Sequence, residues 1–346
     1  MYSFELIDID KVNLEEYYQF GGKNLFTTVE WINYIQINQN AKPIIIRITD
    51  NANFVGYFTG FVFSKFGVKI FASPFNGWTT GYMGFDIVDK YDRVTLIEPI
   101  AKFIFKTFKC LYIQISDRFI EEEQLKNKKI KYIMSRSIEL NINRTNDELF
   151  KVFKTDCRNF IRQFERRGAT IEIAKPDEQF ATEYYEQLKE VFAKQGLVPT
   201  YKVSKVLDLF NSLDSEHILC LRANEPKGQC IATTIFVGYN ERFYFWGAAS
   251  FREFQFYRPN EYMIWYAIKY FRGKGFKYFD MYGERPYKNK FGPEKISYPC
   301  IMIARFSVLI KLRDLAKKMV WIGFKIKGIG RKKSVQQTKA YKKHDK

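Results

Sequence analysis

Histidine is scarce in this sequence of 346 residues, which contains only His217 and His344. His344 lies in a strongly basic segment at the end of the sequence, so a histidine-based centre would have to use His217. His217 directly precedes the apolar run ILCL, a position typical of a strand edge. The shortage argues against Ser-His-Asp chemistry and against zinc, and we expect no metal.

Cysteines with the spacing of a metal or redox motif are also lacking. The five cysteines form no CxxC pair, and none has a metal-ligand spacing to a histidine; they are Cys110, Cys157, Cys220, Cys230 and Cys300. Their number is odd and they are widely spaced. This pattern predicts reduced thiols in a cytoplasmic protein and not a disulfide framework.

Long apolar runs are missing as well. No stretch approaches the ~20 apolar residues of a membrane-spanning helix. The first residues, MYSFELIDIDKVNLEEYY, carry acidic groups and no apolar core of signal-peptide length. We therefore expect a cytoplasmic protein, peripheral at most at the inner face of a membrane.

Positive charge is abundant but unevenly distributed. The net charge is +18, and from Arg305 onward fourteen Lys and Arg stand against two Asp. Residues 306–319 add an apolar helical face, which predicts a helix packed back on the first domain; its members are Val308, Leu309, Leu312, Leu315, Ala316 and Met319. From Trp321 the sequence WIGFKIKGIGRKK is typical of an interfacial segment at anionic lipid.

The predicted elements follow the same order twice along the chain. The first series has helices at 28–35 and 92–108 among short strands, and Pro99 either kinks the second helix or marks its start. The second series has helices at 147–167, 177–194 and 203–213, then three strands, a helix and two strands. This α/β (α+β) pattern, with mixed sheets flanked by helices, predicts a duplicated fold with domains at 1–143 and 144–305 and a basic helix and tail at 306–346; the order in the first domain suits an N-acetyltransferase-type unit.

Four basic residues recur at helical spacing near the start of the second series. Lys154, Arg158, Arg162 and Arg166 are four residues apart and would form one stripe. One interpretation is a solvated charged face. The other is a clamp for phosphates, because guanidinium groups bind phosphate oxygens in pairs.

The stretch from Tyr257 to Gly292 carries the most information about function. Pro259 and Asn260 indicate a helix start, with Asn260 as N-cap. The strand KYFD then ends on Asp280, with Tyr282 two residues later. A loop with Gly283 leads to the pair Tyr287-Lys288 and to Phe291-Gly292. This arrangement can present polar groups at the edge of a sheet.

The order of these residues resembles that of the FemAB-like acyltransferases, which form peptidoglycan bridges or act in envelope polysaccharide synthesis. The matching positions are Pro259-Asn260, Trp265, Gly275, Phe279-Asp280, Gly283, Tyr287-Lys288 and Phe291-Gly292. Weaker matches extend over roughly residues 20 to 305 and include Thr27, Trp31, Lys154, Arg158 and Gly168. Tyr287 departs from the Phe that is more common there, and no long helical arm for tRNA is evident. The resemblance implies two tandem GNAT-like domains.

The resemblance also implies roles for individual residues. Lys288 would stabilise the oxyanion that forms when an amine attacks an acyl ester, unless it is a solvated loop lysine. Its neighbour Lys290 is an alternative for the same position. Asp280, with Tyr282, would accept a proton from the amine or orient it, unless Asp280 only caps a turn. Arg158 matches a family position within the basic stripe.

Two further segments bear on ligand binding. The aromatic, Gly-rich loop with Trp78 and Tyr82 is either a packing corner or the wall of a pocket for a sugar or peptide. After the strand ERFYFWGAAS the chain reads FREFQFYRPN, without the glycines that usually hold the CoA pyrophosphate. CoA in its usual mode is therefore disfavoured, although Arg258 could still contact a phosphate.

These observations predict an acyltransferase that moves an acyl or aminoacyl group to an amine of a peptidoglycan or polysaccharide precursor. The activated ester would be aminoacyl-tRNA or acyl-CoA, with no permanently bound cofactor, and the acceptor would be phosphorylated or lipid-linked. We expect a monomer. The alternatives are a CoA-dependent N-acetyltransferase acting on a nucleotide-sugar amine, a non-enzymatic nucleic-acid-binding protein and an inactive scaffold.

Overall fold

The computed structural model describes residues 1–20, 23–65, 67–194, 196–306 and 308. In this part of the chain no helix is long and apolar enough to cross a membrane. Residues 309–346 lie outside it, and with them most of the predicted helix up to Met319 and all of the predicted interfacial segment from Trp321.

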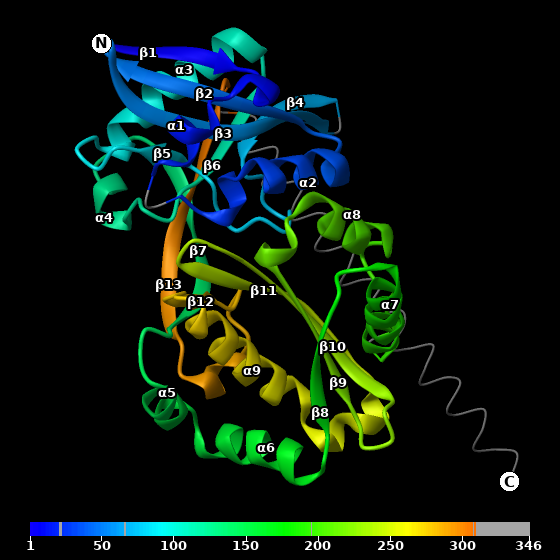
Figure 1. Ribbon diagram of the computed structural model, residues 1–346. Coiled ribbons are helices and arrows are strands. Elements are labelled where there is room, and N and C mark those ends of the chain that lie inside the picture. Colours follow the sequence, from blue (N-terminus) through cyan, green and yellow to red (C-terminus); the bar gives the residue numbers. More distant parts are fainter. Residues whose placement is uncertain (21–22, 66, 195, 307, 309–346) are drawn as a thin grey trace, which may run out of the picture.

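The described residues form one mixed sheet of thirteen strands (Figure 1). The strands are β1 (Tyr2–Ile7), β2 (Lys42–Asp50), β3 (Asn53–Lys65), β4 (Val68–Ser73), β5 (Phe85–Ile87), β6 (Tyr112–Ser116), β7 (Lys131–Asn141), β8 (Thr170–Ala174), β9 (Ile218–Asn224), β10 (Cys230–Tyr239), β11 (Arg242–Ser250), β12 (Tyr278–Asp280) and β13 (Glu294–Ala304). Their spatial order is β1-β2-β3-β4-β6-β13-β7-β12-β11-β10-β9-β8, with β5 beside β3.

The helices cover both faces of this sheet. They are α1 (Leu14–Tyr18), α2 (Val29–Gln39), α3 (Arg93–Phe108), α4 (Glu122–Leu125), α5 (Asn146–Val152), α6 (Thr155–Arg166), α7 (Glu178–Ala193), α8 (Ser204–Ser212) and α9 (Pro259–Gly273). Short 3-10 helices include η4 (Arg252–Tyr257) and η5 (Pro286–Phe291).

The two halves of the sheet repeat one pattern. We call strands β1–β6 with α1–α4 the first half, and strands β8–β12 with α5–α9 the second half. In the first half α3 leads into β6, which runs parallel to β4; in the second, α9 leads into β12, which runs parallel to β11. The repeat agrees with the duplicated α/β order read from the sequence.

Strands β7 and β13 join the halves at the centre of the sheet. β13 pairs antiparallel with β6 of the first half and with β7, and β7 also pairs with β12 of the second half. The last described strand is therefore inserted between two strands that lie much earlier in the chain (Figure 1).

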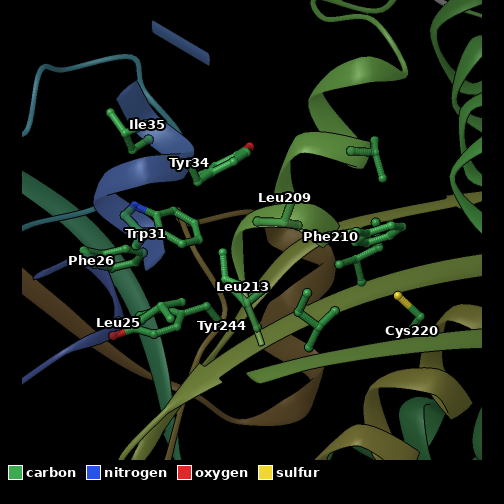
Figure 2. Close-up of a cluster of buried hydrophobic side chains, with 14 of the residues drawn as sticks. Leu25, Phe26, Trp31, Tyr34, Ile35, Leu209, Phe210, Leu213, Cys220 and Tyr244 are labelled. Atoms are coloured by element: carbon green, nitrogen blue, oxygen red, sulfur yellow. The ribbon is translucent and has the colours of Figure 1, made fainter. Parts of the chain in front are cut away.

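Buried aromatic and aliphatic side chains of both halves pack together in one cluster on one face of the sheet. Trp31 and Tyr34 of α2 lie near Leu209 of α8 and Leu213 just after it, and Tyr244 of β11 belongs to the same cluster (Figure 2). A separate apolar cluster packs α6 and α9 on the opposite face of the second half. The side chains of β11 and β12 therefore point alternately into two different environments.

Three local predictions need correction or refinement. The predicted helix 147–167 is interrupted between α5 and α6, because Phe153 is buried in extended conformation and the Lys154 N–H donates to the Lys290 carbonyl at 2.8 Å. Pro99 lies inside α3, which begins at Arg93. Asn260 is the second residue of α9 and not its N-cap, since the helix begins at Pro259 after Arg258 in left-handed conformation (φ 61°).

Candidate active site

Two neighbouring strands diverge at the centre of the second half. β11 and β12 pair in parallel over Arg242–Tyr244 and Tyr278–Asp280 only, and β11 then continues to Ser250. Opposite β10 the register shifts, because Ile235 faces Gly247 while Phe236 faces Phe245. Trp246 is therefore the extra residue of a β-bulge, a feature that often re-aims side chains beside active sites.

Lys288 fills the opening between the diverging strands. Its Nζ donates to the carbonyl oxygens of Met281 and Tyr282, and the residue is 4% exposed. An ammonium group has three N–H donors, so one remains for a ligand. Burial lowers the pKa of Lys288 to about 8, while the negative charge of Asp280 opposes that shift. Lys288 is therefore a buried cation and not the solvated loop lysine of the alternative interpretation.

Lys290, the alternative to Lys288, has a different environment. Its Nζ forms an ion pair with Glu261 in the first turn of α9 and lies 5.5 Å from the centre of the Phe160 ring. Its charge is thus balanced by a nearly buried carboxylate. Of the two lysines, Lys288 is the one that reaches into the strand opening.

Asp280 ends β12 next to this opening. It is 2% exposed and accepts hydrogen bonds from the Ser137 hydroxyl at 2.8 Å and from the Tyr282 N–H at 2.9 Å. Both bonds go to Oδ1, and no described residue donates to Oδ2. Burial raises the pKa of Asp280, and the two hydrogen bonds oppose the rise. A carboxylate with one unused oxygen can accept a proton.

Tyr282 and Tyr82 belong to the buried aromatic layer between the halves. The Tyr282 hydroxyl donates to the Thr79 carbonyl at 3.2 Å, and its backbone turns with φ 53°. The Tyr82 and Tyr244 hydroxyls are 2.8 Å apart, and Arg118 Nη1 donates to the Tyr82 hydroxyl at 2.9 Å. Tyr82 is only 1% exposed, so its ring is covered by protein and offers no free face to a sugar or peptide.

Two cavities are lined by residues that lie near the strand opening. The first, of about 290 Å³, is lined by Trp78, Ser137, Tyr282 and Tyr298 among others, and we call it the inter-half cavity. The second, of about 300 Å³, is lined by residues of β10, β11, η5 and α9, and we call it the α9 cavity. Phe245, Asn260, Tyr287 and Lys290 belong to its lining.

The Lys288 ammonium is in contact with the walls of both cavities. It is bonded to the carbonyl of Tyr282, which lines the inter-half cavity. It also lies 5.3 Å from the ring centre of Phe245 and 5.7 Å from that of Tyr287, both of which line the α9 cavity. Of the predicted residues, the fold therefore brings Lys288, Asp280 and Tyr282 together, and Trp78 lines the inter-half cavity with Tyr282.

The predicted basic stripe lies apart from these residues, along α6 and its N-cap residue. Arg158 is half-buried and donates to the Lys151 carbonyl and the Thr155 hydroxyl, both at 3.2 Å. The Arg162 guanidinium lies 5.4 Å from the Phe150 ring centre, and Lys154 is the N-cap residue of α6. None of these three residues lines the two cavities.

Arg258 joins the stripe to the start of α9. Its guanidinium lies 4.3 Å from the centre of the Phe160 ring on α6, and its buried Nε has no acceptor among the described residues. The position is close to the α9 cavity, since the following residues Asn260 and Glu261 line that cavity.

Sequence reasoning missed several residues that complete the site. Ser137 of β7 holds Asp280, and Phe245 supplies the ring beneath Lys288. Glu261 neutralises Lys290. Each acts across a strand pair or a helix–loop contact between distant residues, so no local motif marks it.

The chain resembles known proteins in sequence over one segment and in fold over most of its length. Residues 151–289 match the acetyltransferase (GNAT) domain. No curated protein sequence matches the chain. Among solved structures, FemX is 14% identical, with a TM-score of 0.67 over 86% of this chain and 96% of that one.

Two other solved structures share the fold at lower identity. A Bacteroides thetaiotaomicron protein of unknown function is 12% identical (TM-score 0.58, 88% of this chain and 100% of that one). A tandem GNAT protein from the clavulanic acid biosynthesis pathway is 7% identical (TM-score 0.51, 88% and 98%). The predicted tandem GNAT-like fold and the predicted class of enzyme, an acyltransferase, are thus confirmed. Residues 151–289 match the GNAT acetyltransferase domain, and the chain as a whole shares its fold with FemX, as the predicted resemblance to the FemAB-like acyltransferases implies.

Proposed function

We propose that the protein transfers an acyl or aminoacyl group from an activated ester to an amine of a cell-envelope precursor. The observation that carries the proposal is the position of the Lys288 ammonium, buried where β11 and β12 diverge and in contact with residues that line both cavities. One cavity can take the acyl donor and the other the amine, so that both reactants meet at one cation.

In this proposal the acyl carbonyl lies beside Lys288. The amine attacks the carbonyl carbon directly; a C–N bond forms, the bond to the leaving group breaks, and no covalent enzyme intermediate arises. The third N–H of Lys288 stabilises the oxyanion of the tetrahedral intermediate. Because the pKa of Lys288 is about 8, its ammonium is largely protonated at neutral pH. Asp280 orients the amine through Oδ2 and takes up its proton.

The α9 cavity suits the donor. α9 starts without a side-chain cap, and the aromatic η4 takes the place of the glycine-rich loop that ordinarily holds a pyrophosphate. The basic surface formed by Lys154, Arg158 and Arg162 adjoins the cavity through Phe160, which contacts both Lys290 and Arg258. A surface with several cations fits the repeated phosphates of a nucleic-acid backbone better than the single pyrophosphate of CoA. We therefore propose aminoacyl-tRNA as the donor and acyl-CoA as the alternative.

The inter-half cavity suits the acceptor. Trp78 presents an aromatic face there, and Ser137, Ser135 and Gln114 add polar groups. This combination is typical of sites for sugars and peptides. The likeness to FemX supports a peptidoglycan or polysaccharide precursor, phosphorylated or lipid-linked, as the acceptor.

Transfer of a labelled group by the purified full-length chain tests the proposal. Charged total tRNA and acetyl-CoA serve as donors, and nucleotide-linked cell-wall precursors and nucleotide amino-sugars serve as acceptors. We expect label in a precursor amide with charged tRNA, its loss in Lys288→Met and its retention in Lys202→Met, where the lysine is exposed on a loop. Equal transfer by Lys288→Met would contradict the proposal, and transfer from acetyl-CoA alone would select the alternative donor.

A further inference from the structure

A third cavity lies at the opposite end of β11 and β12 from Lys288. Its volume is about 330 Å³, and residues of both halves line it, including Asn24, Arg118, Glu139, Arg242 and Tyr278. Arg242 and Tyr278 are the first residues of β11 and β12, whereas the strand opening follows Tyr244 and Asp280 at the other end of the paired segment. We call this space the junction cavity.

The junction cavity contains more positive than negative charge. Glu139 accepts from Arg118 Nη1 and Nη2 at 3.0 and 3.2 Å and from Arg242 Nε at 2.6 Å. Two guanidinium groups therefore share one carboxylate. The other charges of the lining are balanced separately, because Lys23 pairs with Asp86 at 2.9 Å and Glu241 pairs with Lys277. One positive charge remains without a partner.

Two side chains of the lining have hydrogen-bond donors without an acceptor among the described residues. Arg242 donates through Nε alone, and among the described residues its Nη1 and Nη2 have no acceptor; its guanidinium lies 4.7 Å from the Tyr278 ring centre. Asn24 is 4% exposed and caps the next turn, because its Oδ1 accepts from the Phe26 N–H at 2.9 Å. This bond fixes the orientation of the amide, and the buried Nδ2 has no acceptor among the described residues.

We propose that the junction cavity is an oxyanion site that binds a carboxylate or phosphate group. Excess positive charge excludes a cation, and unused donors require a ligand that accepts hydrogen bonds. The planar Nη pair of Arg242 matches two oxygens of a carboxylate or phosphate, and Asn24 Nδ2 supplies a further donor. Since residues of both halves line the cavity, the bound anion would stabilise their association.

This proposal is independent of the proposed acyl transfer, because the junction cavity shares none of its lining residues with the inter-half cavity or the α9 cavity. The oxyanion could be a free solute or the anionic group of a larger ligand. In both cases the donors of the cavity bind the same kind of oxyanion. Small-anion probes and a large-ligand probe distinguish the two sources.

The test is thermal unfolding of the full chain in the presence of inorganic phosphate, acetate or a nucleotide-linked cell-wall precursor, with sodium chloride at matched ionic strength as reference. Binding to the folded state raises the melting temperature in a concentration-dependent way. We expect a rise with phosphate or acetate if the source is a free oxyanion, or with the precursor alone if it is the group of a larger ligand. No rise beyond chloride with any probe overturns the proposal.

Asn24→Asp is the diagnostic variant because it keeps the Oδ1 cap and replaces the unused donor by a negatively charged oxygen. We expect the anion-induced rise to disappear, while Asn211→Asp, with the same charge change at an exposed position of α8, keeps it. If Asn24→Asp does not fold, Arg242→Lys retains the charge without the planar donor pair. Calorimetric titration of this second variant should show at least about tenfold weaker anion affinity, and unchanged affinity overturns the proposal.

Discussion

A buried aspartate follows the parallel strand pair in each half of the molecule, and the two are used differently. Asp117 directly follows β6, and Asp280 ends β12. Each accepts a hydrogen bond from the backbone N–H two residues later, Phe119 at 2.8 Å and Tyr282 at 2.9 Å. The local motif is thus the same in both halves.

The second oxygen distinguishes the two aspartates. Asp117 Oδ2 accepts from the Phe85 N–H at 3.0 Å and lies 3.7 Å from Arg93 Nε, so both oxygens serve to hold the chain. Asp280 makes its bonds through Oδ1 alone. A duplicated fold can therefore keep one copy of a motif for structure and leave the other with an oxygen for chemistry.

The side chains that donate to backbone carbonyl groups beside the two strand pairs also differ. In the first half, Gln114 Nε2 donates to the Pro74 carbonyl at 2.9 Å, a neutral contact that ties the segment after β4 to β6. In the second half, the charged Lys288 of η5 donates to the carbonyl groups of Met281 and Tyr282, just after β12. We therefore propose that the chemistry takes place in the second half.

Replacing each aspartate by asparagine tests most directly whether Asp280 serves catalysis and Asp117 serves structure. Asp280→Asn should lower kcat by ~10²- to 10⁴-fold, the usual range for a general base. Asp117→Asn should leave kcat per folded molecule close to that of the wild type. Steady-state transfer assays, normalised to folded protein by circular dichroism, measure both. A larger loss of turnover in Asp117→Asn would reverse the assignment of the halves.

Lys288→Met should have the next largest effect. We expect kcat to fall by ~10²- to 10³-fold with little change in acceptor KM, because the oxyanion exists mainly in the transition state. The melting temperature should also fall, since two carbonyl groups lose their donor. Lys202→Met, the same change at an exposed loop lysine, should alter neither kcat nor the melting temperature. Full activity of Lys288→Met would remove the strand opening from the mechanism.

The pH dependence of kcat and of stability tests whether Lys288 acts as a protonated ammonium group. Its folded pKa of about 8 lies below its ordinary value of 10.5, so the unfolded chain binds more protons between these values. The contribution of this group to stability therefore rises between pH 8 and 10.5, whereas kcat should fall about tenfold per pH unit above 8. Lys288→Arg, with a charge that does not titrate there, should give a slower but flat profile. A wild-type rate that stays level up to pH 10 would contradict a catalytic ammonium.

Trp78 should produce the smallest effect of this series. Trp78→Ala removes an aromatic face from the inter-half cavity, and we expect acceptor KM to rise about three- to tenfold with kcat nearly unchanged. Tyr91→Ala, which alters a ring packed on the first-half core, is the control. An unchanged KM in Trp78→Ala would mean that the acceptor does not use the first half.

Local sequence signals predicted the elements that carry the site but not their neighbours. Helical spacing and a proline located α3 and α9, and the run KYFD located β12 with Asp280 at its end. The interruption between α5 and α6 was missed because it depends on a hydrogen bond from Lys154 to the distant Lys290. The helical spacing of apolar residues reflects local structure and therefore cannot predict such a tertiary contact.

The environments of the site residues could not be read from the sequence either. Lys288 lies in a polar loop sequence, yet the divergence of two strands buries it. Ser137 reaches Asp280 because β7 pairs with β12, a register that only the complete sheet defines. No sequence motif marked Asp117, so its structural role in the first half was not predicted.

The central position of β13 has a consequence for synthesis of the chain. Cys300 pairs with Ser116 and Met302 with Gln114, so the inner edge of the first half stays open until the ribosome has made almost the whole described chain. Contacts of such high sequence separation slow folding, and an open strand edge invites association with other chains. A nascent chain stalled before residue 294 should therefore need chaperone protection, and its release should trigger closure of the sheet.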